Sequence, residues 1–362
     1  MKEMMMSRNF LKIFHHPYLI GIAVLFCVLL LSPDYAFVAE DTGDRLQRFL
    51  KNDMPFSDKE FDELRGGKTV SKILKTDTKH EVGIISAARI NVSKEYFLRN
   101  YRQKGMNMET ASAGSWGIIS TPPELEDLKA ITLPEEDIED LKKCKPGNCK
   151  VKAPIGAIRK ISQLDAKAPD FEEKANLLIQ QDTVDYLSKY LKDGNRAMVE
   201  YSDKKKPVQL AEQFQGLLEA SPYLRKYVPQ LYAYLDKFPN SHLDHAEDVF
   251  IWLKEDFEKG KMRPILSINH MVLYHPQGSN SNPIVALKQL YAAHYFEASL
   301  GLTVLFEDPE GNGNSLYLLN VTRARIDILR QIPGIFAGKL YRGARNLLHK
   351  RISEVKENME KK

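Results

Sequence analysis

Apolar and polar residues alternate with a period of two over much of the second half of the chain. This pattern appears in segments 247–258, 263–276 and 315–326, and a side-chain period of two predicts β-strands. Residues that share one face of segment 263–276 are Leu266, Ile268, His270, Val272 and Tyr274. Segment 80–92 is rich in β-branched residues and predicts an earlier strand, after which Ser93 is placed to cap a helix.

The segment from Ile284 to Asp308 is apolar almost throughout. A membrane span is disfavoured, because Lys288 and Glu297 would be costly in hydrocarbon. A helix is allowed through Tyr291, but the neighbouring strands favour extended structure. One unbroken strand of this length would reach roughly 80 Å, which is too long for a domain. We therefore expect a break or sharp bend between about 292 and 301, with Gly301 marking it.

A period of 3.6 prevails elsewhere. Residues 106–245 predict mainly helices and loops, in which "SAGSWGIISTPP" has the composition of a connector. The tail after Pro333 predicts one long amphipathic helix with the apolar stripe Phe336, Leu340, Ala344, Leu348, Ile352, Val355 and Met359. The back of this helix is basic. It fits either a helix that covers the domain, which we favour, or one that lies on anionic lipid.

These elements predict an α+β fold in which a curved antiparallel sheet packs on a long C-terminal helix. The expected organisation is a signal peptide or signal anchor over 1–40, a short helical lead-in over 41–67, and one domain over 68–362. Within that domain, a large helical insertion is expected at about 106–194.

The N-terminus has the pattern of an export signal. Basic residues precede the apolar run 18–31, which is shorter than the roughly 20 residues that usually span a bilayer. A bulky Phe37 weakens a cleavage site after Ala39, so both cleavage and retention as an inner-membrane anchor remain open. In either case the rest of the chain is expected on the periplasmic or extracellular side.

Two of the three cysteines, Cys144 and Cys149, flank a short turn-forming segment, "KPGN". A tight turn can bring two cysteines within disulfide distance, and an exported chain meets an oxidising compartment. We therefore predict a disulfide. Zinc binding would need about four ligands, and no second cysteine pair exists, so we predict no metal site.

Composition limits the partners. The chain has 362 residues, 43% of them hydrophobic and 28% charged, which suffices for a substantial core. Its net charge of +4 is far from the clustered basic signature of a nucleic-acid-binding protein. Nucleic acid is therefore not an expected partner, and no motif indicates a cofactor.

The element order resembles the helix-grip fold of START-like proteins. The resemblance covers roughly 68–105 and 195–359 and includes "AARINVSKEYFLRNY", where a strand runs into a Ser-capped helix. It implies a hydrophobic cavity between the sheet and the last helix. The text "HYFEASLGLTVLF" is also similar to exported bacterial proteins, and that second resemblance implies no activity.

Four residues are candidates for the wall of such a cavity. His270 lies on an apolar strand face, His294 and Tyr291 stand close together in sequence, and Arg323 shares a face with apolar residues. His and Tyr could orient a polar head group, and Arg could pair with an anion. For each residue the ordinary alternative is a structural position in the core or at a strand end.

Three functions follow as hypotheses. The first is an exported or membrane-anchored protein that binds a lipid or other apolar molecule in the cavity. The second is an enzyme that uses His270 or His294 as acid or base, which would require a second titratable group beside it in the cavity. The third is an envelope protein that acts through protein contacts, with the cavity filled by side chains.

Overall fold

A large antiparallel sheet organises the described part of the molecule. The computed structural model describes residues 42–103, 113–256, 262–276, 282–332 and 334–361. Within them, eight strands form one sheet in the order β1-β2-β11-β10-β9-β7-β6-β3. The strands are β1 Val70–Leu74, β2 Glu81–Ile90, β3 Ala113–Ile119, β6 Ala246–Glu255, β7 Ile265–Tyr274, β9 Ile284–Ala292, β10 Phe296–Glu307 and β11 Leu316–Ile326. A separate short pair joins β4 Glu200–Tyr201 to β5 Val208–Gln209.

The apolar segment 284–308 is extended, as its sequence predicts. It forms strands β9 and β10, which pair antiparallel around a tight turn at residues 293–295. The prediction that Gly301 marks the bend is wrong, since Gly301 lies inside β10 opposite Leu287 and Thr322. The chain reverses instead at Tyr295, which adopts a positive φ of 58°.

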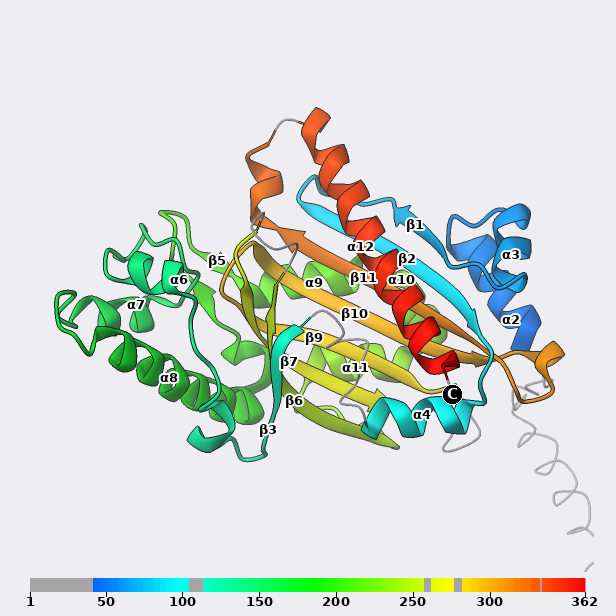
Figure 1. Cartoon of the computed structure of the whole chain (residues 1–362), viewed down its shortest axis with the longest axis horizontal. Coiled ribbons are helices and arrows are strands. Elements are labelled where there is room, and N and C mark those ends of the chain that lie inside the picture. The colour runs from blue at the N-terminus through cyan, green and yellow to red at the C-terminus, as the bar shows by residue number, and fades with distance from the viewer. Residues whose placement is uncertain (1–41, 104–112, 257–261, 277–281, 333, 362) are drawn as a thin grey trace, which may run out of the picture. The chain divides into compact units, whose positions relative to one another are not determined.

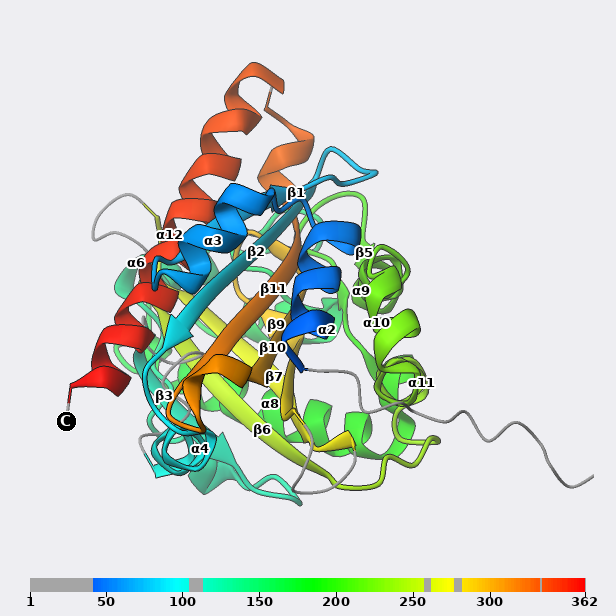
Figure 2. The same cartoon turned by 90° about the vertical axis from the view of Figure 1, so that its right-hand side faces the viewer.

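Helices cover both faces of the sheet. The long helix α12, Gly334–Glu360, crosses one face, and helices α9, α10 and α11 cover the other (Figures 1 and 2). This confirms the predicted α+β class with a sheet packed on a long C-terminal helix. The described helices other than α12 are α2 Thr42–Arg48, α3 Asp58–Arg65, α4 Lys94–Gln103, α6 Glu135–Leu141, α7 Ile155–Ser162, α8 Phe171–Asp193, α9 Leu210–Glu219, α10 Pro222–Tyr227 and α11 Pro229–Lys237. Short helical turns are η1 Phe49–Asp53, η2 Leu125–Leu128, η3 Gly194–Ala197, η4 Pro309–Gly311 and η5 Asp327–Arg330.

Local signals explain several of these boundaries. The Ser93 hydroxyl accepts a hydrogen bond of 3.2 Å from the backbone N–H of Tyr96 and so caps α4, as predicted. The segment expected to be a connector is instead the edge strand β3, which pairs with β6. Its glycines hide the strand signal. Gly117 leaves room for Trp252, whose ring nitrogen lies 2.5 Å from where a Cβ would stand.

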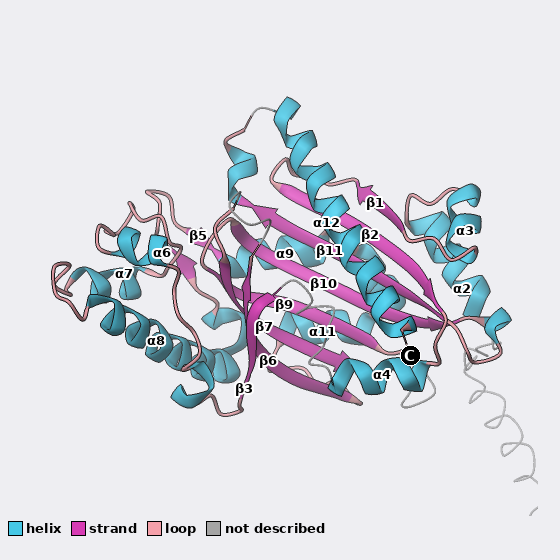
Figure 3. Cartoon of the chain, in the orientation of Figure 1, coloured by secondary structure: helices cyan, strands magenta, loops and turns pink. Residues whose placement is uncertain are grey.

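Helices α6, α7 and α8 lie at one end of the sheet and follow β3 in the chain (Figure 3). In the residues that the structure describes, no helix is long and apolar enough to cross a bilayer. The predicted signal segment 18–31 lies outside the described residues.

The predicted pairing of Cys144 with Cys149 is present. Their sulfur atoms lie at bonding distance and their Cα atoms are 4.6 Å apart, within the usual range for a disulfide. Gly147, with a φ of 76°, makes the turn between them. The turn is tied to the rest of the molecule, because the Gly147 N–H donates to the Ser202 carbonyl at 2.8 Å.

Reduction of this disulfide is expected to lower the free energy of unfolding by about 2 kcal/mol, because so short a loop restrains the unfolded chain only modestly. Urea titrations with and without dithiothreitol measure the difference. A variant with serine at both Cys144 and Cys149 serves as the control and should not respond to the reductant. A wild-type midpoint that dithiothreitol leaves unchanged would contradict the expectation.

Candidate functional site

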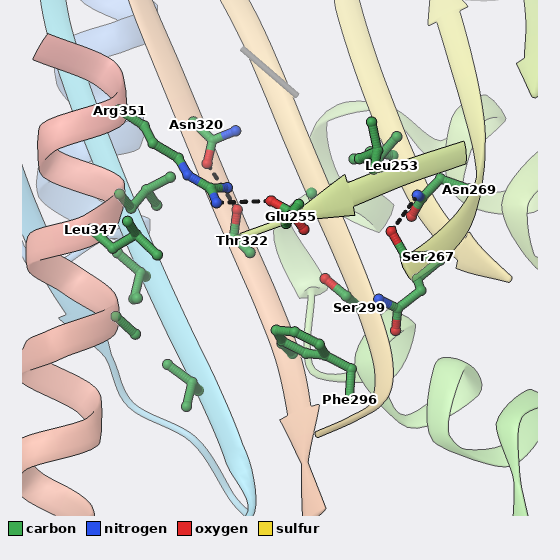
Figure 4. Close-up of a pocket in the computed structure, with 18 of the residues that line it drawn as sticks. Leu253, Glu255, Ser267, Asn269, Phe296, Ser299, Asn320, Thr322, Leu347 and Arg351 are labelled. Carbon is green, nitrogen blue, oxygen red and sulfur yellow. Dashed lines mark hydrogen bonds and ion pairs between the residues drawn. The ribbon is translucent and has the colours of Figure 1, made fainter. Parts of the chain in front are cut away.

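A cavity of about 210 Å³ lies between the sheet and helix α12. It is lined by side chains of β2, β6, β7, β9, β10 and β11, and by one side of the helix (Figure 4). Its helix side is mainly aliphatic, formed by Ala344, Leu347, Leu348, Ile352 and Val355. The resemblance to START-like proteins implies a cavity at this position.

The cavity lies between two apolar clusters that hold the ends of α12. Toward the helix C-terminus, Ile352 and Val355 pack with Met271 and Leu273 of β7. Toward its N-terminus, Ala337 packs with Val82 and Ile84 of β2. Leu348, in the middle of the helix, packs against both clusters, so the helix is held over the sheet along its length.

Beneath the middle of the helix, the sheet presents uncharged polar side chains where a core would normally be aliphatic. We call these residues the polar row: Ser267, Asn269, Gln289, Ser299, Asn320 and Thr322. Four of them are more than nine-tenths buried, namely Ser267, Asn269, Gln289 and Asn320. Buried polar groups need hydrogen-bond partners, so the partner of each of these side chains has to be identified.

Most of the polar row is satisfied within the sheet. The Asn269 amide donates to the Ser267 hydroxyl at 3.0 Å, and the Asn320 amide donates to Thr303 at 2.9 Å. The Thr322 hydroxyl donates to the carbonyl oxygen of Asn320 at 2.9 Å. Gln289 is different. It stands opposite Asn269 on the neighbouring strand and is only 6% exposed, yet its Oε1 atom has no hydrogen-bond partner in the part of the chain that the structure describes.

Gly301 also lines the cavity. Glycine inside a strand weakens it and often marks a close approach of a ligand or another backbone. A Cβ at this position would make only ordinary contacts, 3.7 Å from the Leu287 Cβ and 3.8 Å from the Thr322 hydroxyl. Packing therefore does not demand glycine here, and its absent side chain leaves space in the cavity.

One ion pair bridges the helix and the sheet at the cavity. Arg351 of α12 donates to Glu255 of β6 at 2.8 Å, and Figure 4 shows the arginine extending from the helix over the sheet. Both side chains are largely buried. Among the residues described as lining the cavity, these two carry the only charges, and they neutralise each other.

His270 lies on the opposite face of the sheet, among the helices. Its Nε2 donates to Asp248 at 2.8 Å, and its Nδ1 shares a hydrogen bond of 3.1 Å with the Tyr190 hydroxyl. Burial lowers the pKa of His270, and the neighbouring Asp248 carboxylate offsets only part of that effect. His270 is therefore held neutral in a packed core.

The same hydrogen-bonded chain continues to Lys288, which is fully buried. Its ammonium nitrogen donates to the Tyr190 hydroxyl at 2.9 Å and also to the amide oxygen of Asn195. It lies 4.4 Å from the centre of the Phe214 ring. Burial lowers the pKa of Lys288 well below its usual value of 10.5, and the Asp236 carboxylate, which is not bonded to it, offsets only part of this effect.

Tyr291 and His294 also lie away from the cavity. The Tyr291 hydroxyl donates to the Lys152 carbonyl at 2.7 Å, and burial raises its pKa well above the usual range. His294 Nε2 bonds to the buried Asp137 carboxylate at 2.9 Å. Both side chains connect the β9–β10 turn to the segment around the disulfide.

Arg323 of β11 pairs with a protein carboxylate. Its Nη1 donates to Glu81 of β2 at 2.6 Å, and Glu81 is 1% exposed. The Arg323 guanidinium therefore has an internal partner at the position where the sequence suggests an anionic ligand.

None of these four residues is among those that line this cavity, and the reason is the direction in which alternate side chains of the strands point. Strand β7 is buried at all ten positions, so both of its faces are covered. Leu266, Ile268 and Val272 share the face of His270 and pack on the helical layer, whereas Asn269 faces α12. The set of alternate residues that is more apolar was interpreted as the cavity wall. The polar row belongs to the other set, which points to the opposite face of the sheet. Its signal was asparagine, glutamine and serine within otherwise apolar strands.

Comparison with protein-family models, with curated proteins and with solved structures finds no match for this chain. The case for a function therefore depends on the geometry of the cavity.

Proposed function

We propose that this protein binds a small, largely apolar molecule in the cavity between the sheet and helix α12. The observation that carries the proposal is the cavity itself, which leaves about 210 Å³ open where the sheet and helix could pack directly. A completely filled interface would have favoured an envelope protein that works through protein contacts. Concave sites with apolar walls and a few placed polar groups are typical of small-molecule binding.

The enzyme alternative receives less support from the geometry. It requires a histidine that meets a second titratable group inside the cavity. His270 and His294 each meet a carboxylate, but both lie outside the cavity lining. Binding without chemical conversion is therefore the function that we propose.

The element order supports a place among START-like helix-grip proteins as part of the same proposal. Export, with the site on the periplasmic or extracellular side and attachment through residues 18–31, also remains a proposal from the sequence pattern. In this setting a soluble binding site could hold an apolar molecule in an aqueous compartment.

Replacing Gly301 with valine tests the function. The added side chain enters the cavity and should reduce occupancy by a copurified molecule at least tenfold, while the strand, which favours β-branched residues, should be at least as stable. Native mass spectrometry of the full-length protein from its own host measures the occupancy. Thermal unfolding measures the stability.

Gly114→Val on the edge strand β3 is the matched control, because Gly114 lies outside the cavity lining and has room for a Cβ. It should keep the bound molecule. The proposal fails if wild-type protein repeatedly carries no small molecule, or if Gly301→Val retains it at the wild-type level.

A further inference from the structure

The size of the cavity limits its occupant. Cavities of about 150 Å³ are known to hold benzene, whereas drug-sized ligands occupy roughly 300–1,000 Å³. A volume of about 210 Å³ therefore fits one six-membered ring with a short substituent. A two-chain lipid is too large to be enclosed at this site.

The charges of the lining favour a neutral occupant. Arg351 and Glu255 bind each other at 2.8 Å, and the other lining residues that the structure describes are uncharged. A charged ligand would lose its hydration without gaining a free counter-charge, which carries a large penalty. The apolar helix side adds nothing that could replace that hydration.

Gln289 indicates which hydrogen-bonding group the occupant carries. Among the described residues its Oε1 atom is a buried acceptor without a donor, whereas the Asn269 and Asn320 amides each donate to a neighbouring hydroxyl. Leaving a buried acceptor unpaired costs about 1–3 kcal/mol. Turning this amide toward the cavity would let a ligand hydroxyl or amide N–H bond to Oε1 and so remove that penalty.

We infer that the ligand is a neutral one-ring molecule that carries a hydrogen-bond donor, which it gives to Gln289, while its ring packs on the aliphatic side of α12. This inference rests on the proposed function and specifies the class of ligand. Polar contact with the sheet and apolar contact with Leu347 and Ile352 would fix the orientation of the ring.

Four probes of similar size test the inference: 1-phenylethanol, acetophenone, benzoate and benzylammonium. The first two differ chiefly in that only the alcohol can donate a hydrogen bond. With the full-length protein freed of copurified molecules, calorimetry should show 1-phenylethanol binding about fivefold more tightly than acetophenone, the factor expected for one net hydrogen bond of about 1 kcal/mol. The two ions should bind at least tenfold more weakly than the alcohol.

Gln289→Met removes the acceptor and should abolish the preference for the alcohol while leaving the affinity for acetophenone nearly unchanged. Gln180→Met is the matched control, because Gln180 is a buried glutamine that bonds to the Ile131 carbonyl far from the cavity lining. It should keep the fivefold preference. A comparison with Gly301→Val assigns the binding to this cavity, because this variant should bind all the neutral probes more weakly than the wild-type protein.

The possible outcomes separate the two proposals. If none of the probes binds and the wild-type protein also carries no copurified molecule, the proposed function fails. If the neutral probes bind equally, if an ion binds best, or if Gln289→Met keeps the preference, the inferred ligand class is overturned and the binding function stands. Should Gln289→Met fail to fold, the comparison of alcohol with ketone on the wild-type protein decides the matter.

Discussion

Lys288→Met is expected to raise the free energy of unfolding by about 1–4 kcal/mol at pH 7, the range seen where the replacement of buried ionic groups by apolar side chains of similar volume is stabilising. Lys288 is 0% exposed, and its bonded partners are the neutral side chains Tyr190 and Asn195. Methionine keeps most of the volume of lysine and removes the buried amine. Chemical denaturation of both proteins measures the difference.

The pH dependence of the free energy of unfolding provides a second test of the same variant. The unfolded chain holds a proton on Lys288 up to a pH near 10.5, whereas burial lowers the pKa of this group in the folded state. Between the two pKa values the unfolded state binds more protons, so stability rises with pH by as much as about 1.4 kcal/mol per unit. This contribution is complete above 10.5 and is lost as the pH falls toward the folded-state pKa. Lys288→Met should lack that slope.

Lys152→Met is the matched control, because Lys152 is a second buried lysine that does have a carboxylate partner. Its ammonium group lies 3.0 Å from Asp327 and helps to lower the pKa of that carboxyl group, against the opposing effect of burial. This variant should lose about 1.5–3 kcal/mol, the contribution of a hydrogen bond to a charged group. Equal effects of the two substitutions would contradict our account of Lys288.

Glu81→Gln is expected to lower the free energy of unfolding by about 3–5 kcal/mol, because it leaves buried positive charge without its carboxylate. Glu81 bonds to Arg323 at 2.6 Å, and its second oxygen lies 3.7 Å from Arg325. Urea denaturation measures the loss.

The exposed pair of Arg65 and Glu310 provides the comparison, and Glu310→Gln should change stability by less than about 1 kcal/mol. A small effect of Glu81→Gln would mean that Arg323 is free to serve another partner. In that case the anion-binding role that the sequence suggested for Arg323 would deserve a direct test with benzoate.

The sequence predicts the elements of this fold better than their orientation. Alternation identified strand β7, and the apolar stripe identified helix α12. Alternation cannot assign a face when both faces are buried, and β7 has Ile268 directed to one layer and Met271 to the other. The candidate ligand residues were therefore placed on the wrong side. Contacts such as His270 with Tyr190 join residues 80 positions apart, and no local pattern encodes them.

The turn between β9 and β10 illustrates a second limit. It lacks the glycine and proline that usually mark a reversal, and the positive φ falls on Tyr295. Long-range contacts hold this turn, because the Tyr295 hydroxyl accepts from the Arg263 N–H at 3.1 Å and the Asp327 N–H donates to the Tyr295 carbonyl at 2.8 Å. Gly301 offered the stronger local signal, but it reflects open space beneath α12.

Helix α12 is synthesised after the sheet that it covers. The helix follows every strand that it covers, so a nascent chain that has emerged only through β11 has its uncharged amides and hydroxyls facing solvent. If the cavity binds a small molecule as we propose, that molecule can be enclosed only after α12 has been synthesised.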